Sequence, residues 1–460
     1  MIRLSRSFLW RAKEFSNVQH IGRRASQIQC YSEYVQPKEA IPDNTDVSSK
    51  TAAANLPNES ENIPQSKYLS ADTFQKAIES SKLYSERECI ELSNSLEVTK
   101  AAELVKVISQ TKSRPIKLLR PLVSKIASSK ETLNLLVCSN LLYSLSCLSY
   151  RDKCILDKIA NDILSKKKTF TNGSLPASIL QSCGVLKYRN CELIDTLLHA
   201  ILYSSSPKRI EGLLAGLMTL SIVNYFPKYG TLILNELLNC KSTDFSQTKA
   251  YVDFTWACIL LDQPLAQHIS CVLSESFINK LEVVLEYSGQ QETVNKKILQ
   301  INAAAQLLLK SYNGPTLEKV RCRLLNSKSK TQFLASVVDG LSHIFPKYGY
   351  LATSVDTGSG FLLDVECVLD SKGNPLPLKR RKDGIRIAIM LIGYNDLCLD
   401  EQNTEIGPIV FQQRILEAKG FKVVKVIYSE YDELLKLCDK VDYLRKKLQT
   451  ITAATFESTN

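Results

Sequence analysis

The chain has 460 residues, more than one hydrophobic core usually supports, so its length predicts two or three domains. Hydrophobic residues make up 44% and charged residues 23%, a globular composition that excludes a mainly disordered chain. Lys and Arg exceed Asp and Glu by 58 to 47, and the net charge of +11 is compatible with a polyanionic partner. No apolar run approaches the ~18 residues of a membrane-spanning helix, so we expect no membrane insertion.

The cysteines and histidines indicate neither a zinc site nor a disulfide framework. None of the 14 cysteines forms a C-x-x-C pair, and the four histidines are far apart in the sequence. A zinc site needs closely spaced soft ligands. Most cysteines lie inside apolar helical patterns, as Cys138 does, so we interpret them as buried thiols in a reducing compartment. We predict no metal and no cofactor.

Residues 1–31 have the composition of a mitochondrial presequence. Their six basic residues stand against a single acid, Glu14, among bulky apolar and hydroxyl side chains. An Arg-rich, acid-poor segment of this kind directs mitochondrial import, whereas a secretory signal needs an apolar stretch, which Arg11 and Lys13 interrupt. We predict localisation in the mitochondrial matrix, with an ordinary basic tail as the alternative. Residues 32–69, rich in Pro, Ser, Asn and Thr, are predicted to be a disordered linker.

Residues 70–335 show a helical period. Apolar residues recur at every fourth position, as at Ile155, Ile159 and Ile163, which gives each helix one apolar stripe. Two capping boxes, at 85–88 and 128–131, are predicted to start helices.

A repeat of 37–38 residues lies within this region. Residues 141–151 reappear as residues 179–189, with Asp195 in the place of Asp157, and a more divergent third copy has Tyr225 in the place of Tyr188. This period predicts one helical hairpin per unit, stacked as a solenoid, with an irregular helical bundle as the alternative. A solenoid offers a long surface for a single-stranded nucleic acid or a peptide.

From about residue 336 to 450 the pattern changes to a small α/β domain, followed by a tail at 451–460. Strands are predicted at 361–369, 385–392 and 422–428, with a helix from Gly407 to Lys419 that ends at Gly420. A further helix is expected after Ser429, and another over 441–448. The strand–helix–strand order predicts a parallel pair of strands.

This C-terminal region resembles the RAP domain found in the FAST kinase domain-containing family of mitochondrial proteins. The RAP-like residues, over about 385–445, include Arg414, Leu416, Gly420, Glu430, Tyr431, Tyr443 and Leu444. Two upstream segments, around 252–277 and 301–315, resemble the FAST segments of the same family. The family commonly has Trp where this chain has Tyr431, so an aromatic residue is kept. The resemblance implies a restriction-endonuclease-like fold for the RAP domain and a role in mitochondrial RNA processing, stability or translation. Arg414, Glu430 and Tyr443 could form either structural pairs or ligand contacts.

Kinase and nuclease chemistry can both be tested against the sequence. A kinase needs a Gly-rich phosphate loop followed by catalytic and metal-binding Asp residues, and the chain has neither His-Arg-Asp nor Asp-Phe-Gly. A restriction-like nuclease needs carboxylates on two adjacent strands. Asp364 and Glu366 share one face of a strand and form half of such a site, but the next strand supplies no acid and no Lys. We therefore predict a non-enzymatic, degenerate nuclease scaffold.

The basic residues are better explained by nucleic-acid binding. A dense cluster lies in the loop between two predicted strands, and aromatic–arginine pairs recur at equivalent repeat positions, where they could stack on unpaired bases or pack within the hairpin turns. The candidate RNA-binding residues are Lys379, Arg380, Arg381, Lys382, Arg386, Arg151, Arg189, Tyr150 and Tyr188.

The sequence thus predicts a mitochondrial factor that binds single-stranded RNA and controls the stability or processing of transcripts, with RNA-processing proteins as further partners. The alternatives are a metal-dependent RNA endonuclease and a helical scaffold that binds peptides.

Overall fold

The computed structural model describes residues 84–457 except 112–113, 167–169, 171–172, 205–209, 287–288, 319, 321, 347, 433 and 435, with side chains up to residue 450. The predicted presequence and linker lie outside these residues. The described residues form two compact units, divided between Thr132 and Leu133. No helix within them is long and apolar enough to cross a membrane.

The smaller unit contains three helices, α4 (Glu86–Ser95), α5 (Val98–Gln110) and α6 (Ile116–Ser128). The predicted capping box at Ser85 is confirmed, because its hydroxyl accepts from the Glu88 amide and the Glu88 carboxylate accepts from the Ser85 amide. The box predicted at 128–131 is wrong. Ser128 ends α6, and the next helix is capped by Asn134, whose side chain accepts from the Val137 amide.

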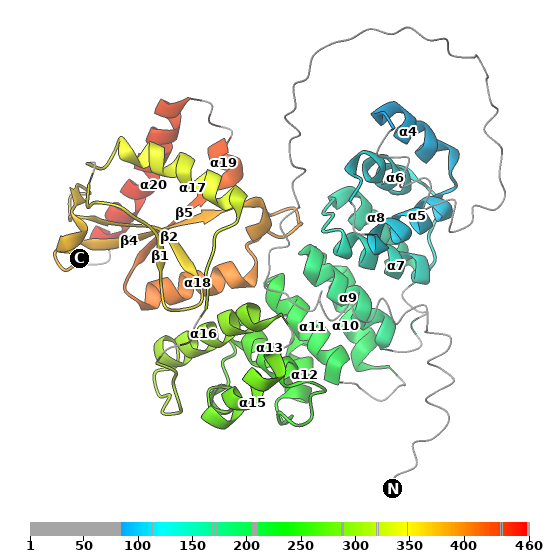
Figure 1. The fold of residues 1–460 in the computed structure, drawn as a ribbon, viewed down its shortest axis with the longest axis horizontal. Coiled ribbons are helices and arrows are strands. Elements are labelled where there is room, and N and C mark those ends of the chain that lie inside the picture. Colours follow the sequence, from blue (N-terminus) through cyan, green and yellow to red (C-terminus); the bar gives the residue numbers. More distant parts are fainter. Residues whose placement is uncertain are drawn as a thin grey trace. The chain divides into compact units, whose positions relative to one another are not determined.

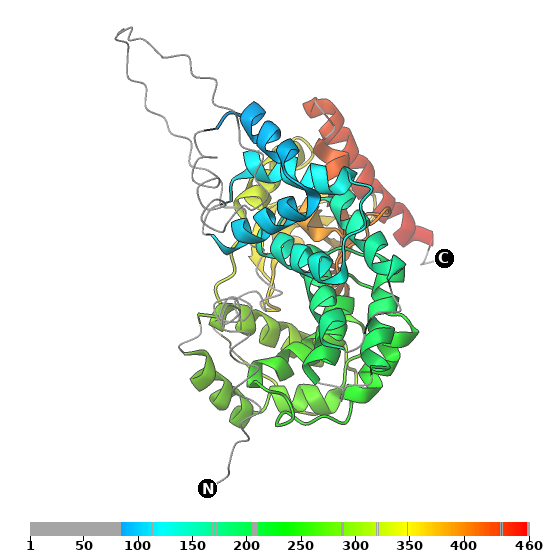
Figure 2. The ribbon, with the colours of Figure 1, turned by 90° about the vertical axis from the view of Figure 1, so that its right-hand side faces the viewer.

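The larger unit begins with three helical hairpins that match the sequence repeat (Figures 1 and 2). The Tyr188 hydroxyl donates to Asp157 of the preceding hairpin at 2.8 Å, and Tyr225 donates in the same way to Asp195 at 3.0 Å. The repeated Tyr and Asp thus join neighbouring repeats. The hairpins are α7 (Leu135–Cys147) with α8 (Lys153–Ser165), α9 (Ser174–Leu186) with α10 (Cys191–Leu202), and α11 (Ile210–Ile222) with α12 (Lys228–Leu237).

Four further helices continue the array: α13 (Thr248–Leu260), α14 (Ala266–Val272), α15 (Glu275–Leu285) and α16 (Gln291–Leu307). Helix α13 is buried almost all round and packs on α16. A buried ion pair joins these two helices, with Lys297 Nζ 2.6 Å from Asp253 Oδ1 and 4.6 Å from the centre of the Trp256 ring.

A mixed sheet follows the helical array, in the order β1–β2–β4–β5, with β3 also paired to β2. The pair β4–β5 is parallel, as predicted, with Ile387 opposite Lys422, and the other pairs are antiparallel. The strands are β1 (Ala352–Asp356), β2 (Leu362–Leu369), β3 (Pro375–Leu376), β4 (Ile385–Ile392) and β5 (Lys422–Ile427), with short 3₁₀ turns η2 (Leu378–Arg380) and η3 (Tyr394–Asp396).

Helices cover both faces of this sheet (Figure 1). On one face, α17 (Lys328–Ser342) and α20 (Leu437–Glu457) enclose a core that includes Val365, Ile389 and Val426. On the other face lies α18 (Gly407–Ala418), which also packs on α11, α13 and α16 of the array. Because α17 belongs to the sheet core, the predicted domain boundary at 335/336 falls inside a helix.

The predicted class, a helical array followed by a small α/β domain, is confirmed, with local differences. Strand β1 is exposed along much of its length, so it lacks the apolar run that marks a buried strand in the sequence. Tyr428 begins the short helix α19 (Tyr428–Asp432), so Ser429 lies inside that helix and does not cap it. Helix α20 extends beyond the predicted 441–448 into the predicted tail.

Candidate nucleic-acid interface

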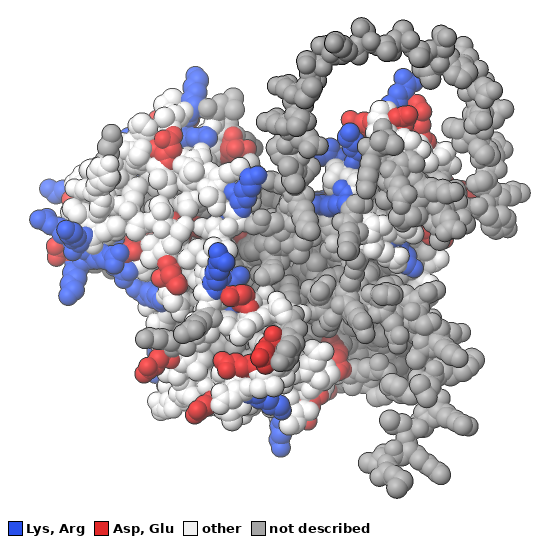
Figure 3. Space-filling model, in the orientation of Figure 1, with Lys and Arg blue, Asp and Glu red and all other residues white. Residues whose placement is uncertain are grey.

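Basic side chains gather at the end of the sheet where β4 and β5 begin. The β3–β4 loop supplies four exposed cations, and Arg386 follows on β4. Two more cations lie nearby. Lys422, the first residue of β5, is paired with Ile387 of β4, and Lys419, just after α18, accepts at its carbonyl from Arg386 Nη1. We name this surface the basic sheet end; it comprises Lys379, Arg380, Arg381, Lys382, Arg386, Lys419 and Lys422. Figure 3 shows Lys and Arg side chains gathered over this part of the sheet domain.

A buried carboxylate anchors the basic sheet end. Glu366 is only 2% exposed, in the middle of β2, and both of its oxygens accept from arginines. Arg381 makes a two-point contact, with Nε 3.1 Å from Oε1 and Nη2 3.2 Å from Oε2, and Arg386 Nη2 lies 3.4 Å from Oε1. One carboxylate therefore holds two guanidinium groups of the surface.

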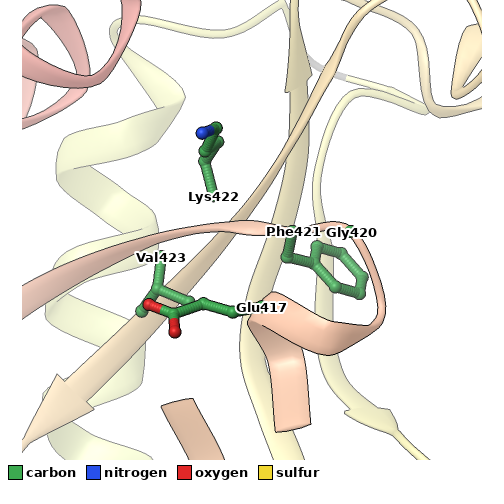
Figure 4. A pocket seen from close by; sticks show the side chains of 5 residues that line it. All are labelled: Glu417, Gly420, Phe421, Lys422 and Val423. Atoms are coloured by element: carbon green, nitrogen blue, oxygen red, sulfur yellow. The ribbon is translucent and has the colours of Figure 1, made fainter. Parts of the chain in front are cut away.

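Arg386 also packs against an aromatic ring. Its guanidinium carbon lies 3.9 Å from the centre of the Phe421 ring, a cation–π contact. Burial lowers the pKa of Lys419, the Asp356 charge opposes this, and the neighbouring Arg386 charge lowers the pKa again. The Lys419 ammonium donates to the Thr357 carbonyl. Beside them, Glu417, Gly420, Phe421, Lys422 and Val423 line an open hollow of about 380 Å³. Figure 4 shows Phe421 and Lys422 leaving the start of β5 in different directions, with Glu417 beside Val423.

The other predicted carboxylate, Asp364, is engaged elsewhere. It is 3% exposed, its Oδ2 lies 3.1 Å from Lys330 Nζ, and it accepts from the Leu391 amide at 2.8 Å. Burial raises the pKa of Asp364, and the Lys330 ammonium opposes that rise. Asp364 and Glu366 thus share a face, as predicted, but each is neutralised by basic side chains. Within the described part of the chain, no three His, Cys, Asp or Glu side chains group so as to hold a metal ion.

The repeat-turn arginines contact the sheet domain. Arg151 donates to the Leu397 carbonyl at 2.7 Å and lies over the Tyr394 ring, and Arg189 pairs with Asp400 at 3.1 Å. Tyr188 is 1% exposed and donates to Asp157, so its contacts in this structure are those of packing between hairpins. Tyr150 lies beside Arg151 in the first of these turns and is half-buried. The repeat turns are therefore a docking surface for residues 394–404.

Arg414 also joins the helical array to the sheet domain. It pairs with Asp262 and donates to the carbonyls of Ile259 and Leu260, at the end of α13. In this structure the Arg414 guanidinium therefore contacts protein groups that hold α18 against α13.

The other RAP-like residues also have structural partners. Tyr431 is buried and donates to the Ser336 carbonyl at 2.9 Å, which retains the packing role expected for an aromatic residue there. Tyr443 donates to Glu430 at 2.7 Å. Gly420 ends α18 with φ +81°, and Leu416 and Leu444 are core residues.

Sequence reasoning missed four side chains that matter here. Lys419 and Lys422 border the basic sheet end, but single lysines around a helix end give no signal in the sequence. Lys330 reaches Asp364 from α17, which lies 34 residues earlier in the chain, and Tyr394 meets Arg151 across 243 residues. Only the fold brings such pairs together.

Comparison with known protein families assigns three segments of the chain. Residues 213–282 match FAST kinase-like protein, subdomain 1, residues 295–377 match FAST kinase-like protein, subdomain 2, and residues 391–447 match the RAP domain. The sheet is therefore shared, with β1, β2 and β3 from the second subdomain and β5 from the RAP domain. Residues 378–390, which carry most of the basic sheet end, lie in none of the three matches.

Individual relatives agree with these matches. FAST kinase domain-containing protein 4 is 22% identical over 80% of this chain in both Rattus norvegicus and Homo sapiens, and the mitochondrial FAST kinase domain-containing protein 3 of Mus musculus is 27% identical over 50% of it. The matches cover 61%, 61% and 36% of those proteins, so this chain spans about three fifths of the length of the first two. The order of the segments and the short length of the chain predict a particular resemblance to protein 4. With two FAST kinase-like subdomains followed by a RAP domain, the chain is similar to the FAST kinase domain-containing proteins.

Proposed function

We propose that this protein binds single-stranded RNA in mitochondria, without cleaving it, and controls the stability or processing of the bound transcripts. The observation that carries this proposal is the basic sheet end, where seven cations from two loops and two strands meet on one surface. Cations gathered on one surface can contact several phosphates and give a largely sequence-independent, salt-sensitive affinity.

The state of the two β2 carboxylates favours binding over hydrolysis. A restriction-like site needs carboxylate oxygens that are free to hold Mg²⁺ between strands. Both oxygens of Glu366 face guanidinium groups, and Asp364 faces Lys330 and a backbone amide. A cation at Glu366 or at Asp364 Oδ2 would have to displace these partners first, and Asp364 Oδ1, which has no hydrogen-bond partner among the described residues, is buried.

The cellular location is proposed from residues 1–31 and from a relative's name. The protein 3 relatives are named mitochondrial, and the presequence composition predicts the same address for this chain, in the matrix. Changing Arg3, Arg6 and Arg11 together to Glu is expected to abolish mitochondrial import of the full chain. Import at the wild-type level would contradict the presequence assignment.

The binding proposal is tested on the β3–β4 loop with the anchored Arg381 left in place. Changing Lys379, Arg380 and Lys382 to Ala removes three exposed charges and spares the buried Glu366. Folding should change little, because exposed substitutions usually cost within about 0.5 kcal/mol each. Affinity for all single-stranded RNAs should fall together, and the slope of log K against log salt should shrink by about 0.7 per lost phosphate contact. Fluorescence anisotropy across a salt series measures both quantities.

Three results would count against the proposal. Wild-type affinity in the triple variant would exclude Lys379, Arg380 and Lys382 from RNA contact. Binding of the wild type that does not depend on salt would favour the peptide scaffold. Metal-dependent RNA cleavage by the pure wild-type protein would favour the nuclease. Changing Lys100, which is paired with Glu103 on α5, to Ala provides a control for the loss of a single positive charge outside the sheet domain.

A further inference from the structure

Glu366 and Arg381 form a two-point ion pair with a defined orientation. A surface that attracts RNA by charge alone would not need such an orientation. Glu366 engages Arg381 from the side, through Nε and Nη2. A guanidinium group has five N–H donors, so this contact leaves the two donors of Nη1 and one of Nη2 facing away from the carboxylate. The Arg381 side chain is 49% exposed, whereas Glu366 is buried beneath it. The outward edge of Arg381 is thus fixed in position and open to solvent.

The surroundings fix this edge further. Arg386 shares Glu366 with Arg381 and is itself held between the Phe421 ring and the Lys419 carbonyl. With two arginines around one carboxylate, the cluster keeps a net positive charge. Arginine presents parallel donors that match two oxygens of a phosphate, a geometry that a lysine ammonium cannot reproduce.

We propose that Arg381 holds one RNA phosphate through its outward edge, and that Glu366 is the positioning residue that orients it. This inference rests on the proposed RNA binding and adds to it one geometrically specified phosphate contact among otherwise diffuse ones. The half-site carboxylate that the sequence suggests as a metal ligand is, on this account, the support of a phosphate-binding arginine.

A charge-conserving substitution separates geometry from charge. Arg381→Lys keeps the charge and removes the paired donors, so affinity for a labelled mixed-sequence single-stranded RNA should fall roughly tenfold with little change in salt slope. The matched control is Arg445→Lys on α20, because Arg445 is equally exposed at 48% and also ion-paired, to Asp442 at 2.7 Å. The control should bind within about twofold of the wild type. An unchanged affinity in Arg381→Lys would overturn the inference.

Glu366→Gln gives a test in which the two explanations differ in sign. If charge alone matters, removing a negative charge near the RNA should tighten binding. If Glu366 positions Arg381, the variant should bind more weakly, despite its more positive surface. Tighter binding by folded Glu366→Gln would overturn the positioning role. Thermal unfolding checks whether the variant is folded. If Glu366→Gln does not fold, Arg381→Lys, at an exposed site, still tests the phosphate contact of Arg381.

Two further measurements complete the design. RNAs with a 5′-hydroxyl and with a 5′-phosphate distinguish an internal phosphodiester from a terminal phosphate. We expect Arg381→Lys to lose affinity equally for both RNAs. A loss of affinity confined to the 5′-phosphate RNA would overturn an internal contact. The proposed function fails separately, when the wild type shows no salt-dependent RNA binding. A wild type that binds, combined with an Arg381→Lys variant that binds equally well, defeats only the present inference.

Discussion

Asp364 is a buried carboxylate whose charge is balanced by a lysine from another element. Changing Asp364 to Asn removes the ion pair with Lys330 and keeps an acceptor for the Leu391 amide. We expect the free energy of unfolding to fall by about 2 kcal/mol, because a charged hydrogen bond is lost in a buried place. RNA affinity should be unchanged, since Asp364 does not contact the basic sheet end. Urea denaturation and RNA binding on the same samples measure the two effects.

A double-variant cycle shows whether Lys330 is the partner. Combining Asp364→Asn with Lys330→Met should cost less than the sum of the two single changes, because each single change leaves one group of the pair without its partner. Additive losses would mean that the pair contributes no coupling. Loss of a metal-dependent RNA cleavage in Asp364→Asn would instead give the nuclease first place.

Lys187 is a second residue whose protonation depends on the fold. It ends α9 in the left-handed region, with φ 54°, and its ammonium donates to the Asn395 carbonyl of the sheet domain. Burial lowers the pKa of Lys187 from 10.5 to about 8, and the nearby Arg151 charge lowers it further, against the opposing charge of Asp396. Below about pH 8 the folded protein therefore carries a buried charge there.

The lowered pKa of Lys187 predicts a direction for stability against pH. Between about pH 8 and pH 10.5 the unfolded chain still binds the Lys187 proton and the folded chain does not, so this residue's contribution to stability increases with pH. The free energy of unfolding of the wild type minus that of Lys187→Met should therefore rise across this window, as measured by urea denaturation under reducing conditions. A flat or falling difference would mean that Lys187 keeps an ordinary pKa in the fold.

At the scale of elements, α18 depends on a close backbone approach. Gly407 is the first residue of α18, and a Cβ placed there would lie 1.9 Å from the Ser221 carbonyl oxygen of α11. No real Cβ fits at that distance from a backbone atom, so Gly407→Ala must push α18 away from the array. We expect it to lower the free energy of unfolding by about 1–3 kcal/mol or more, as overpacking does.

A second helical glycine supplies the control for this substitution. At Gly212 in α11 the nearest atom to an added Cβ is Ala177 Cβ at 3.7 Å, an ordinary contact. Gly212→Ala should therefore be neutral or stabilising by about 0.5–1 kcal/mol, because Ala is the better helix former. Equal thermal shifts for the two variants would show that the α11–α18 approach is not a tight one.

At the scale of the whole molecule, the RAP match is not a separate fold. Residues 391–447 lack β2, which pairs with β4, and lack α17, whose Phe333 and Val337 belong to the sheet core. Expressed alone, this segment would expose that core and the face of α18 that packs on the array, so we expect it to be unfolded by circular dichroism. Residues 133–457, the larger compact unit, should unfold cooperatively. A cooperative transition in the isolated RAP segment would contradict this shared core.

The sequence by itself determined the elements whose signals are local. Hydrophobic period, capping residues and the Gly407 and Gly420 boundaries predicted the repeat helices, α18 and strand β4, because the side chains that form each of these elements lie within a few residues of one another. Three further features could be read from the sequence for the same reason. They are the FAST and RAP resemblance, the basic cluster at 379–382, and the shared face of Asp364 and Glu366.

Only the tertiary structure decided what those residues contact. Arg151, Arg189 and Tyr188 have the sequence pattern of a base-stacking surface, yet their partners lie in the 394–404 segment and in the neighbouring repeat. Glu366 fits a metal half-site by spacing, but Arg381 and Arg386 meet it across a β hairpin, and Lys419 and Lys422 join them only through the parallel pairing of β4 and β5. The role of a charged side chain depends on the opposite charges that the fold brings within a few ångströms, and sequence separation carries no information about that distance.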